Sequence, residues 1–172
     1  YMMIHPGKKL NFMGNELGEY KEWDEKVALG WNILKYPIHD SFHKFMIRLN
    51  EVYKTYPCMY EQDYGMDGFE WLVVDDRAQS VFAIERKGTD GSSLIAVMNF
   101  TGNKHEGSMV PVNQPGSYKE ILNSDTDIYT GSNFVNKRAI KAKEGQTLNK
   151  EYYIPVNIAP FGSMIFEYKG SK

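Results

Sequence analysis

The sequence has little cysteine, no excess of positive charge and no long hydrophobic run. Cys58 is the one cysteine among 172 residues, so an intramolecular disulfide is impossible, and a chain of this length needs neither disulfides nor a metal to fold. Lys and Arg total 20 against 22 Asp and Glu, a net charge of −2, so we expect no binding to nucleic acid. The longest aliphatic run, residues 94–98, is far shorter than the ~20 residues of a membrane-spanning helix. We therefore expect no nucleic-acid partner and no membrane partner.

The start of the chain and its single thiol indicate what kind of protein the chain comes from and where it is located. Tyr1 is not a translational start, and the first residues lack the charged segment and apolar core of a secretory signal. We therefore expect a piece of a longer protein. A lone thiol is typical of a reducing compartment, so we expect a cytoplasmic location.

Aromatic residues are abundant, at 14% of the chain, which suits a β-rich core and also suits sugar binding. The composition changes near residue 65. Before that point, residues 9–13 read as a short strand. Residues 41–56 carry apolar side chains every three or four positions, which predicts a helix with Asp40 or Ser41 as N-cap and Pro57 as terminator. A strand, an acidic loop and a helix in this order form one βα unit, the repeat of a (β/α)8 barrel.

Beyond residue 65, short apolar runs alternate with turn signals such as Asp90-Gly91 and Glu144-Gly145. The predicted strands are residues 69–75, 79–86, 93–100, 107–112, 117–122, 135–142, 147–156 and 163–168. Eight short strands without helices between them predict a mainly β chain with an antiparallel sandwich. Pro155 marks its strand end as an edge.

The sequence also predicts where two particular side chains lie. Trp71 shares one face of its strand with Phe69 and Val73, so we expect it in the core. Cys58 has no cationic cluster beside it in the sequence, so we expect an inert, buried thiol.

The most informative polar residues follow the predicted strand at 9–13. Asn15 and Glu16 could hydrogen-bond sugar hydroxyls, and the indole of Trp23 could stack on a pyranose ring. If the βα unit belongs to a barrel, this loop lies on the face where such enzymes hold their active sites. The same residues could instead satisfy backbone groups at a strand end and pack the loop, and the sequence leaves both roles open.

Other polar groups in this region give weaker signals. Retaining glycoside chemistry needs two carboxylates about 5 to 5.5 Å apart, and the spacing of Glu19, Glu22 and Asp24 selects no pair. His39 and His43 would share a helix face, but a metal site needs at least one more placed ligand. We therefore expect a solvated acidic loop without a metal or a cofactor.

Six motifs, in order along nearly the whole chain, closely resemble the C-terminal portion of bacterial 1,4-α-glucan (glycogen) branching enzymes of the α-amylase superfamily. They are HPGKKL at 5–10, FMGNE at 12–16, EWD at 22–24, GFEW at 68–71, NQPG at 113–116 and EILNSD at 120–125. The pattern departs from the family at Leu17, where Phe is usual, and at Gly30, where Asp is usual.

The resemblance implies a division of the chain. Residues 1–64 would be the end of the catalytic (β/α)8 barrel, with the eighth strand at 9–14 and the last helix at 41–56. Residues 65–172 would be the C-terminal all-β domain of α-amylase type. Asn15, Glu16 and Trp23 would line glucan subsites.

The resemblance also implies a reaction. The family cleaves an α-1,4-glucan chain and rejoins it through an α-1,6 link in glycogen biosynthesis, by retaining chemistry with an aspartate nucleophile, a glutamate acid/base and a second aspartate. Those residues lie on barrel strands before the eighth, and His39-Asp40 is followed by Ser41 instead of the Glu that the family's last catalytic motif requires. We therefore expect no catalytic residue in this chain, and its partners to be α-glucan, such as glycogen or amylose-like chains, and the upstream barrel of the same protein.

Three roles remain open for this chain. It could be the non-catalytic end of a branching enzyme, a stand-alone glucan-binding sandwich, or a sandwich that only braces a barrel. Electrophoresis in gels containing glycogen or amylopectin would separate the second role from the third, because a brace should migrate without retardation.

Overall fold

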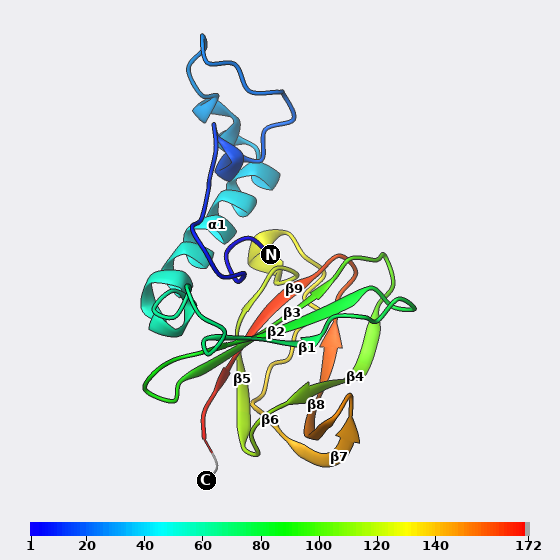
Figure 1. Cartoon of the computed structure of the whole chain (residues 1–172). Helices are drawn as coiled ribbons and strands as arrows, with labels where there is room; N and C mark the ends of the chain where they lie inside the picture. The colour runs from blue at the N-terminus through cyan, green and yellow to red at the C-terminus, as the bar shows by residue number, and fades with distance from the viewer. Residues whose placement is uncertain (171–172) are drawn as a thin grey trace.

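The computed structural model describes residues 1–170, which form a front segment of residues 1–68 and a β-sandwich that begins at Phe69 (Figure 1). The strands are β1 (Phe69–Val73), β2 (Val81–Lys87), β3 (Ser93–Asn99), β4 (His105–Val112), β5 (Ser117–Asn123), β6 (Ile140–Lys141), β7 (Lys143–Thr147), β8 (Lys150–Ile158) and β9 (Ser163–Tyr168). Sheet A has the strand order β1-β2-β3-β9-β5-β6, and sheet B has the order β4-β8-β7. All strand pairs are antiparallel, so the predicted antiparallel, mainly β fold is confirmed.

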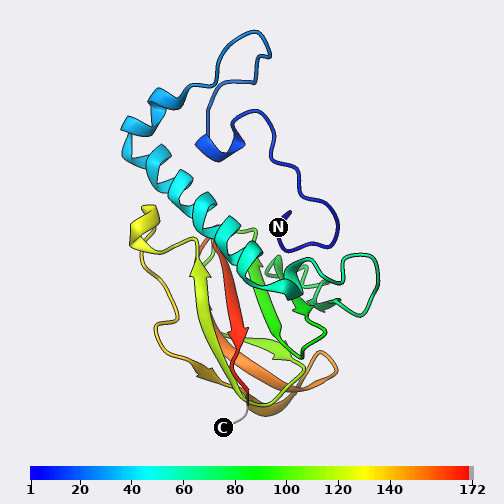
Figure 2. The same cartoon turned by 90° about the vertical axis from the view of Figure 1, so that its left-hand side faces the viewer.

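Two hydrophobic clusters lie on opposite faces of sheet A. The first lies between the sheets, where Val97 and Phe166 of sheet A meet Ile154 and Val156 of sheet B. The second lies on the other face of sheet A, beneath α1 (Pro37–Thr55) (Figure 2). Every residue of β3 is buried because this strand is covered on both faces, which explains its uninterrupted apolar sequence.

The helix α1 begins earlier than its periodicity predicts. Pro37 occupies the first turn, where its missing N–H costs nothing and its fixed φ suits a helix. The predicted N-caps are therefore wrong: Asp40 pairs with Lys44 at 2.6 Å, and the Ser41 hydroxyl donates to a backbone carbonyl within the helix. The helix ends at Thr55, before Pro57, as predicted.

The strand predicted over residues 9–13 does not form in the described chain. A lone strand has no stability without a neighbour to pair with, and the strands of both sheets begin only at Phe69. The assignment of this segment as an eighth barrel strand stays a prediction. Within residues 1–170 no helix is long and apolar enough to cross a membrane.

The region between β5 and β8 differs most from the predicted strands. Of the strand predicted over 135–142, only Ile140–Lys141 forms, and Glu144-Gly145, predicted as a turn, lies inside β7. The actual turn is at Leu148 and Asn149, which adopt φ values of 46° and 66°. The loop before β6 stays irregular because the carboxylates of Asp125 and Glu120 accept the backbone N–H groups of Phe134 and Asn136, which a strand would use for pairing.

Two further predictions on strand positions are wrong. Pro155 lies in β8, which is the central strand of sheet B. It is tolerated there because the pairing with β7 reaches only to Tyr153, so Pro155 has one paired neighbour. Trp71 packs against a core cluster as predicted, but it does not share a face with Val73. A bulge at Leu72 turns the strand, so Phe69 and Trp71 pack on the α1 side and Val73 joins the cluster between the sheets.

Candidate functional site

The candidate glucan-binding residues lie in the front loop, residues 11–36, at the end of α1 that is far from the sandwich (Figure 1). Asn15 and Glu16 begin a 3-10 turn, Asn15–Leu17, with glycines in the left-handed region on either side, Gly14 at φ 87° and Gly18 at φ 62°. Leu17 is completely buried and anchors the turn, so Asn15 is left exposed and Glu16 half-buried.

Two histidines of α1 hold this turn in place. The ring Nδ1 atom of His39 lies 2.9 Å from the carbonyl oxygen of Leu17, and that of His43 lies 3.2 Å from the carbonyl oxygen of Glu16. Their helical spacing presents both rings to one stretch of backbone. Among the described residues, no group of three or more His, Cys, Asp or Glu side chains is placed to hold a metal ion. The two contacts with the carbonyl groups of Glu16 and Leu17 brace the loop against α1.

Asn15 and Trp23 line the same hollow, and Glu16 does not line it. The hollow has a volume of about 420 Å³ and is lined by Phe12, Asn15, Trp23 and Phe42, among others. Trp23 is 53% exposed and meets the Phe12 ring edge-on, with centroids 5.4 Å apart. The Glu16 carboxylate accepts a hydrogen bond of 2.5 Å from the Asn11 amide. We call this cavity the Trp23 hollow.

The other carboxylates of the front loop act as local braces. Glu19 accepts the backbone N–H of Gly30 at 3.1 Å, and Asp24 accepts that of Lys26 at 2.9 Å. Each carboxylate thus bonds to its own stretch of loop. This arrangement supports the shape of the loop and gives no acid/base pair for glycoside chemistry.

A second hollow in the front loop has no counterpart in the sequence predictions. It has a volume of about 610 Å³, and its lining residues include Tyr20, Asn32, Tyr36 and His39. These residues follow no period that a sequence could show, because they meet through the fold of the loop back onto the start of α1. We call this cavity the Tyr20 hollow.

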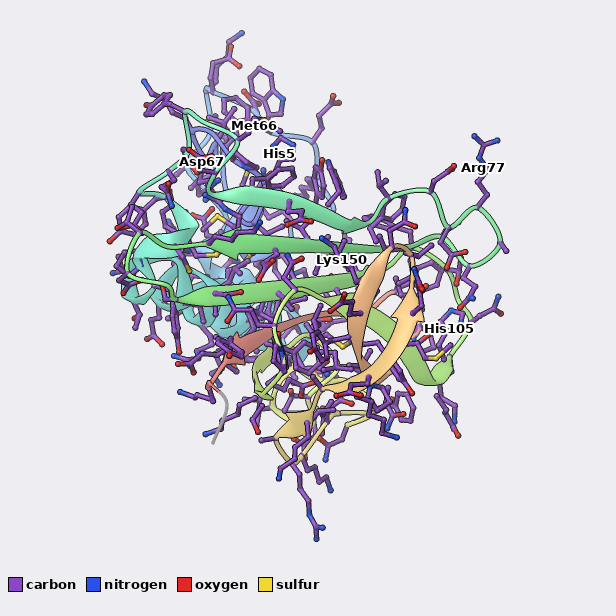
Figure 3. The ribbon with its side chains drawn as sticks, turned by 60° about the horizontal axis from the view of Figure 1, so that its bottom comes forward. His5, Met66, Asp67, Arg77, His105 and Lys150 are labelled. Atoms are coloured by element: carbon purple, nitrogen blue, oxygen red, sulfur yellow. The ribbon has the colours of Figure 1, made fainter. Side chains whose placement is uncertain are left out.

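The sandwich carries a polar network that the sequence also left unmarked. The Glu70 carboxylate of β1 accepts hydrogen bonds from Lys87 at 2.5 Å, from Asn113 at 2.8 Å and from Lys150. Figure 3 shows Lys150 where the β7–β8 hairpin meets sheet A. Burial by itself raises the pKa of Glu70, but the three donors outweigh it and lower the pKa to about 2. The network joins the two sheets.

The loop that follows β5 is held by two carboxylates. Asp125 accepts the N–H of Ser132 at 3.1 Å and that of Phe134 at 2.9 Å, while Glu120 accepts the N–H and the side-chain amide of Asn136. These contacts fix an irregular segment against the sheet.

Cys58 is buried with no exposed surface, as predicted. Burial raises the pKa of its thiol to about 11. A thiol in this state is a poor nucleophile at neutral pH.

Comparison with known proteins gives a family match for the sandwich. Residues 71–169, which begin within β1 and end after β9, match the family described as "Alpha amylase, C-terminal all-beta domain". The chain belongs to this family. The α-amylase C-terminal all-β domain thus accounts for the sandwich, and the resemblance stated from the sequence motifs is confirmed by relatives that also match the front segment.

Those relatives carry one name. The 1,4-alpha-glucan branching enzyme GlgB of Saccharophagus degradans is 36% identical over 167 residues, which are 97% of this chain and 23% of the relative. The enzyme of the same name from Geobacillus stearothermophilus is 38% identical over 166 residues, which are 96% of this chain and 26% of the relative. The chain therefore spans about a quarter of the length of the curated relatives it matches.

Solved structures support the fold of this α-amylase C-terminal all-β domain and the segment before it. A cyclomaltodextrinase matches with a TM-score of 0.53 at 15% identity, covering 96% of this chain and 24% of that protein. The catalytic module of the pneumococcal virulence factor SpuA matches with a TM-score of 0.52 at 9% identity, covering 84% and 20%. At these identities the likeness shows the fold alone.

Proposed function

We propose that this chain is the C-terminal portion of a glycogen branching enzyme, which transfers segments of α-1,4-glucan to form α-1,6 branches. The observation that carries the proposal is the identity of 36–38% to enzymes of that name along 96–97% of the chain. The match includes the front segment, which the family of the all-β domain does not reach. A sandwich shared by many α-amylase relatives would not by itself select this activity.

In this proposal the chain supports the reaction and does not perform it. Retaining transfer needs a nucleophile and a separate acid/base held at fixed distance. The carboxylates of Glu16, Glu19 and Asp24 are bonded to neighbouring loop groups, and none of them forms such a pair. The catalytic residues would then belong to an upstream barrel, and the whole enzyme would act in the cytoplasm.

The sandwich would brace that barrel through the second hydrophobic cluster. Val52 of α1 and Met59, just after the helix, are fully buried against Ile84 and Leu94 of sheet A. Arg86, also fully buried, donates to Asp63 at 2.5 Å and to the carbonyl of Ile4 at 3.0 Å, so it ties the first residues of the chain to β2. This packing favours the bracing role as the second candidate function, and the two roles are compatible.

The front loop would contribute to substrate binding. Trp23 offers an exposed indole face in a hollow that Asn15 also lines, which is the combination of flat apolar surface and polar group that sugars require. Glu16 would act indirectly, because its carboxylate accepts a hydrogen bond from Asn11 and so holds the loop beside the hollow. On this basis we propose that Asn15 and Trp23 contact glucan and that Glu16, the third residue predicted for this site, supports them from within the loop.

An iodine-stain branching assay tests the proposal. The whole gene product should branch amylose, and the chain of residues 1–172 alone should show no turnover above background. Trp23→Ala in the whole product should lower the rate markedly with little change in unfolding temperature. Trp31→Ala is the matched control, because Trp31 is also 53% exposed but lies outside the Trp23 hollow.

Three results would contradict the proposal. Turnover by residues 1–172 alone would place catalytic residues in this chain. A whole product that does not branch amylose would remove the proposed activity. An unchanged rate for Trp23→Ala, or a markedly lower unfolding temperature of this variant, would show that Trp23 packs the loop and does not bind glucan.

A further inference from the structure

The Tyr20 hollow carries two exposed aromatic side chains on one buried support. Tyr20 is 84% exposed and Tyr36 is 52% exposed. Both rings lie against the ring of His39, with centroid distances of 5.2 Å and 6.5 Å. His39 is buried and its Nδ1 atom is bonded to the Leu17 carbonyl. Both tyrosine rings thus contact the same buried imidazole while much of their surface stays open to solvent.

The polar groups around these rings suit hydroxylated ligands. Asn32, Glu19 and Lys21 line the same hollow and offer an amide, a carboxylate and an ammonium group. Flat aromatic surface flanked by such donors and acceptors is the chemistry that binds a sugar, because a pyranose has an apolar face and a rim of hydroxyls.

Glu19 and Lys21 line both the Tyr20 hollow and the Trp23 hollow, so these two side chains form the wall between them. Gly30 lines the Tyr20 hollow and a third cavity that Trp23 also lines. The wall is closed by the hydrogen bond of 3.1 Å from the Gly30 N–H to the Glu19 carboxylate. A Cβ atom at position 30 would lie 2.2 Å from that carboxylate oxygen, so any other residue would displace Glu19 and change the wall.

We propose that the Tyr20 hollow is a second subsite for α-glucan, next to the Trp23 hollow, with Tyr20 as its stacking platform and Gly30 as the residue that sets its shape. The inference rests on the proposed function, which supplies the substrate class. A glucan chain that crosses the shared wall would contact both aromatic platforms, so the front loop would hold successive glucose units.

Affinity electrophoresis of the 172-residue chain in gels containing amylopectin tests this subsite. The unmodified chain should be retarded. Tyr20→Ala should weaken the apparent affinity about tenfold, the usual effect of truncating an aromatic anchor, and Gly30→Ala should weaken it through the displaced wall. Tyr20→Phe, which keeps the ring, should stay close to the unmodified chain. Tyr64→Ala is the matched control, because Tyr64 is 92% exposed and lies outside both hollows.

The outcomes separate the subsite from the proposed function. Equal retardation of Tyr20→Ala and the unmodified chain would overturn the subsite while leaving glucan binding intact. A lack of retardation of the unmodified chain would also overturn it, and the branching assay on the whole gene product would still decide the enzymatic activity. A Tyr20→Ala chain that unfolds at a markedly lower temperature would overturn the subsite by assigning Tyr20 to packing.

Discussion

Glu85 and Arg86 are consecutive residues of β2 with opposite charges, and both are almost completely buried, at 1% and 0% exposure. Successive side chains of a strand point to opposite faces. Glu85 therefore reaches the space between the sheets, where Ser93 donates to it at 2.5 Å and Asn113 also donates. Arg86 reaches the front segment, where Asp63 accepts its hydrogen bond. One dipeptide thus connects sheet A to the layers on both of its sides.

The thiol of Cys58 should be almost unreactive in the folded chain. Its pKa is raised by burial from 9.0 to about 11, so about a hundredfold fewer molecules carry the thiolate at pH 8 than for an ordinary thiol. We expect iodoacetamide to label the native chain slowly and the urea-unfolded chain rapidly. Equal labelling rates in the two states would contradict the buried position.

The carboxylate of Glu70 should make folding stability depend on pH. Its donors lower the pKa from 4.5 to about 2, so its contribution is complete above the unfolded pKa and is lost as the pH falls toward 2. Glu70→Gln should lower the free energy of unfolding by about 2 kcal/mol at pH 7 and should match the unmodified chain near pH 2. Urea unfolding at several pH values measures this difference.

Glu106→Gln provides the control for that experiment. Glu106 also pairs with a lysine, Lys104, at 2.7 Å, but the side chains are well exposed, and exposed ion pairs contribute little to stability. Its unfolding midpoint should hardly move. A Glu70→Gln chain that shows the same small effect at every pH would argue against the network between the sheets.

The loop after β5 illustrates what determines structure at the scale of an element. It passes so close to the start of the same loop that a Cβ atom at Gly131 would lie 2.2 Å from the backbone oxygen of Asp125. We expect Gly131→Ala to destabilise the fold by about 1 to 3 kcal/mol, since the backbone must shift to make room. Thermal unfolding measures the loss.

Gly65→Ala is the matched change. A Cβ atom there meets nothing within 4 Å, so stability should change by no more than about 0.5 kcal/mol. If both alanine variants behave alike, the close approach of the loop to Asp125 does not govern its stability.

At the scale of the whole molecule, the sandwich was predictable because its strands follow simple local rules. The Asp90-Gly91 turn forms the predicted hairpin tip, with Gly91 at φ 83° and a hydrogen bond of 2.8 Å from Gly88 N–H to the Ser92 carbonyl. The segment near Asp125 was not predictable, because capture of backbone N–H groups by a carboxylate has no periodic signature. The two hollows of the front loop depend on contacts between residues far apart in the sequence, such as Tyr20 and His39.

The front loop and the sandwich should differ in local stability. Residues 9–13 form no strand, and Leu10 is 68% exposed, whereas every residue of β3 is buried and the strand lies between β2 and β9 in sheet A. Local opening needs less free energy where backbone groups are open to water. In hydrogen exchange we expect the amides of residues 9–13 to exchange much faster than those of β3. Equal protection of both segments in a dilute monomer would contradict this.

Sheet A packs against apolar side chains on both of its faces, which limits how this sandwich can be combined with other domains. β3 gives Ile95 and Val97 to the cluster between the sheets, and Leu94 and Ala96 to the cluster beneath α1. A sandwich that begins at residue 65 and is fused to an unrelated partner would expose the apolar face of sheet A that α1 covers. Exchange of this module between enzymes should therefore succeed when α1 is transferred with it, so the transferable unit is larger than residues 71–169 that match the all-β family.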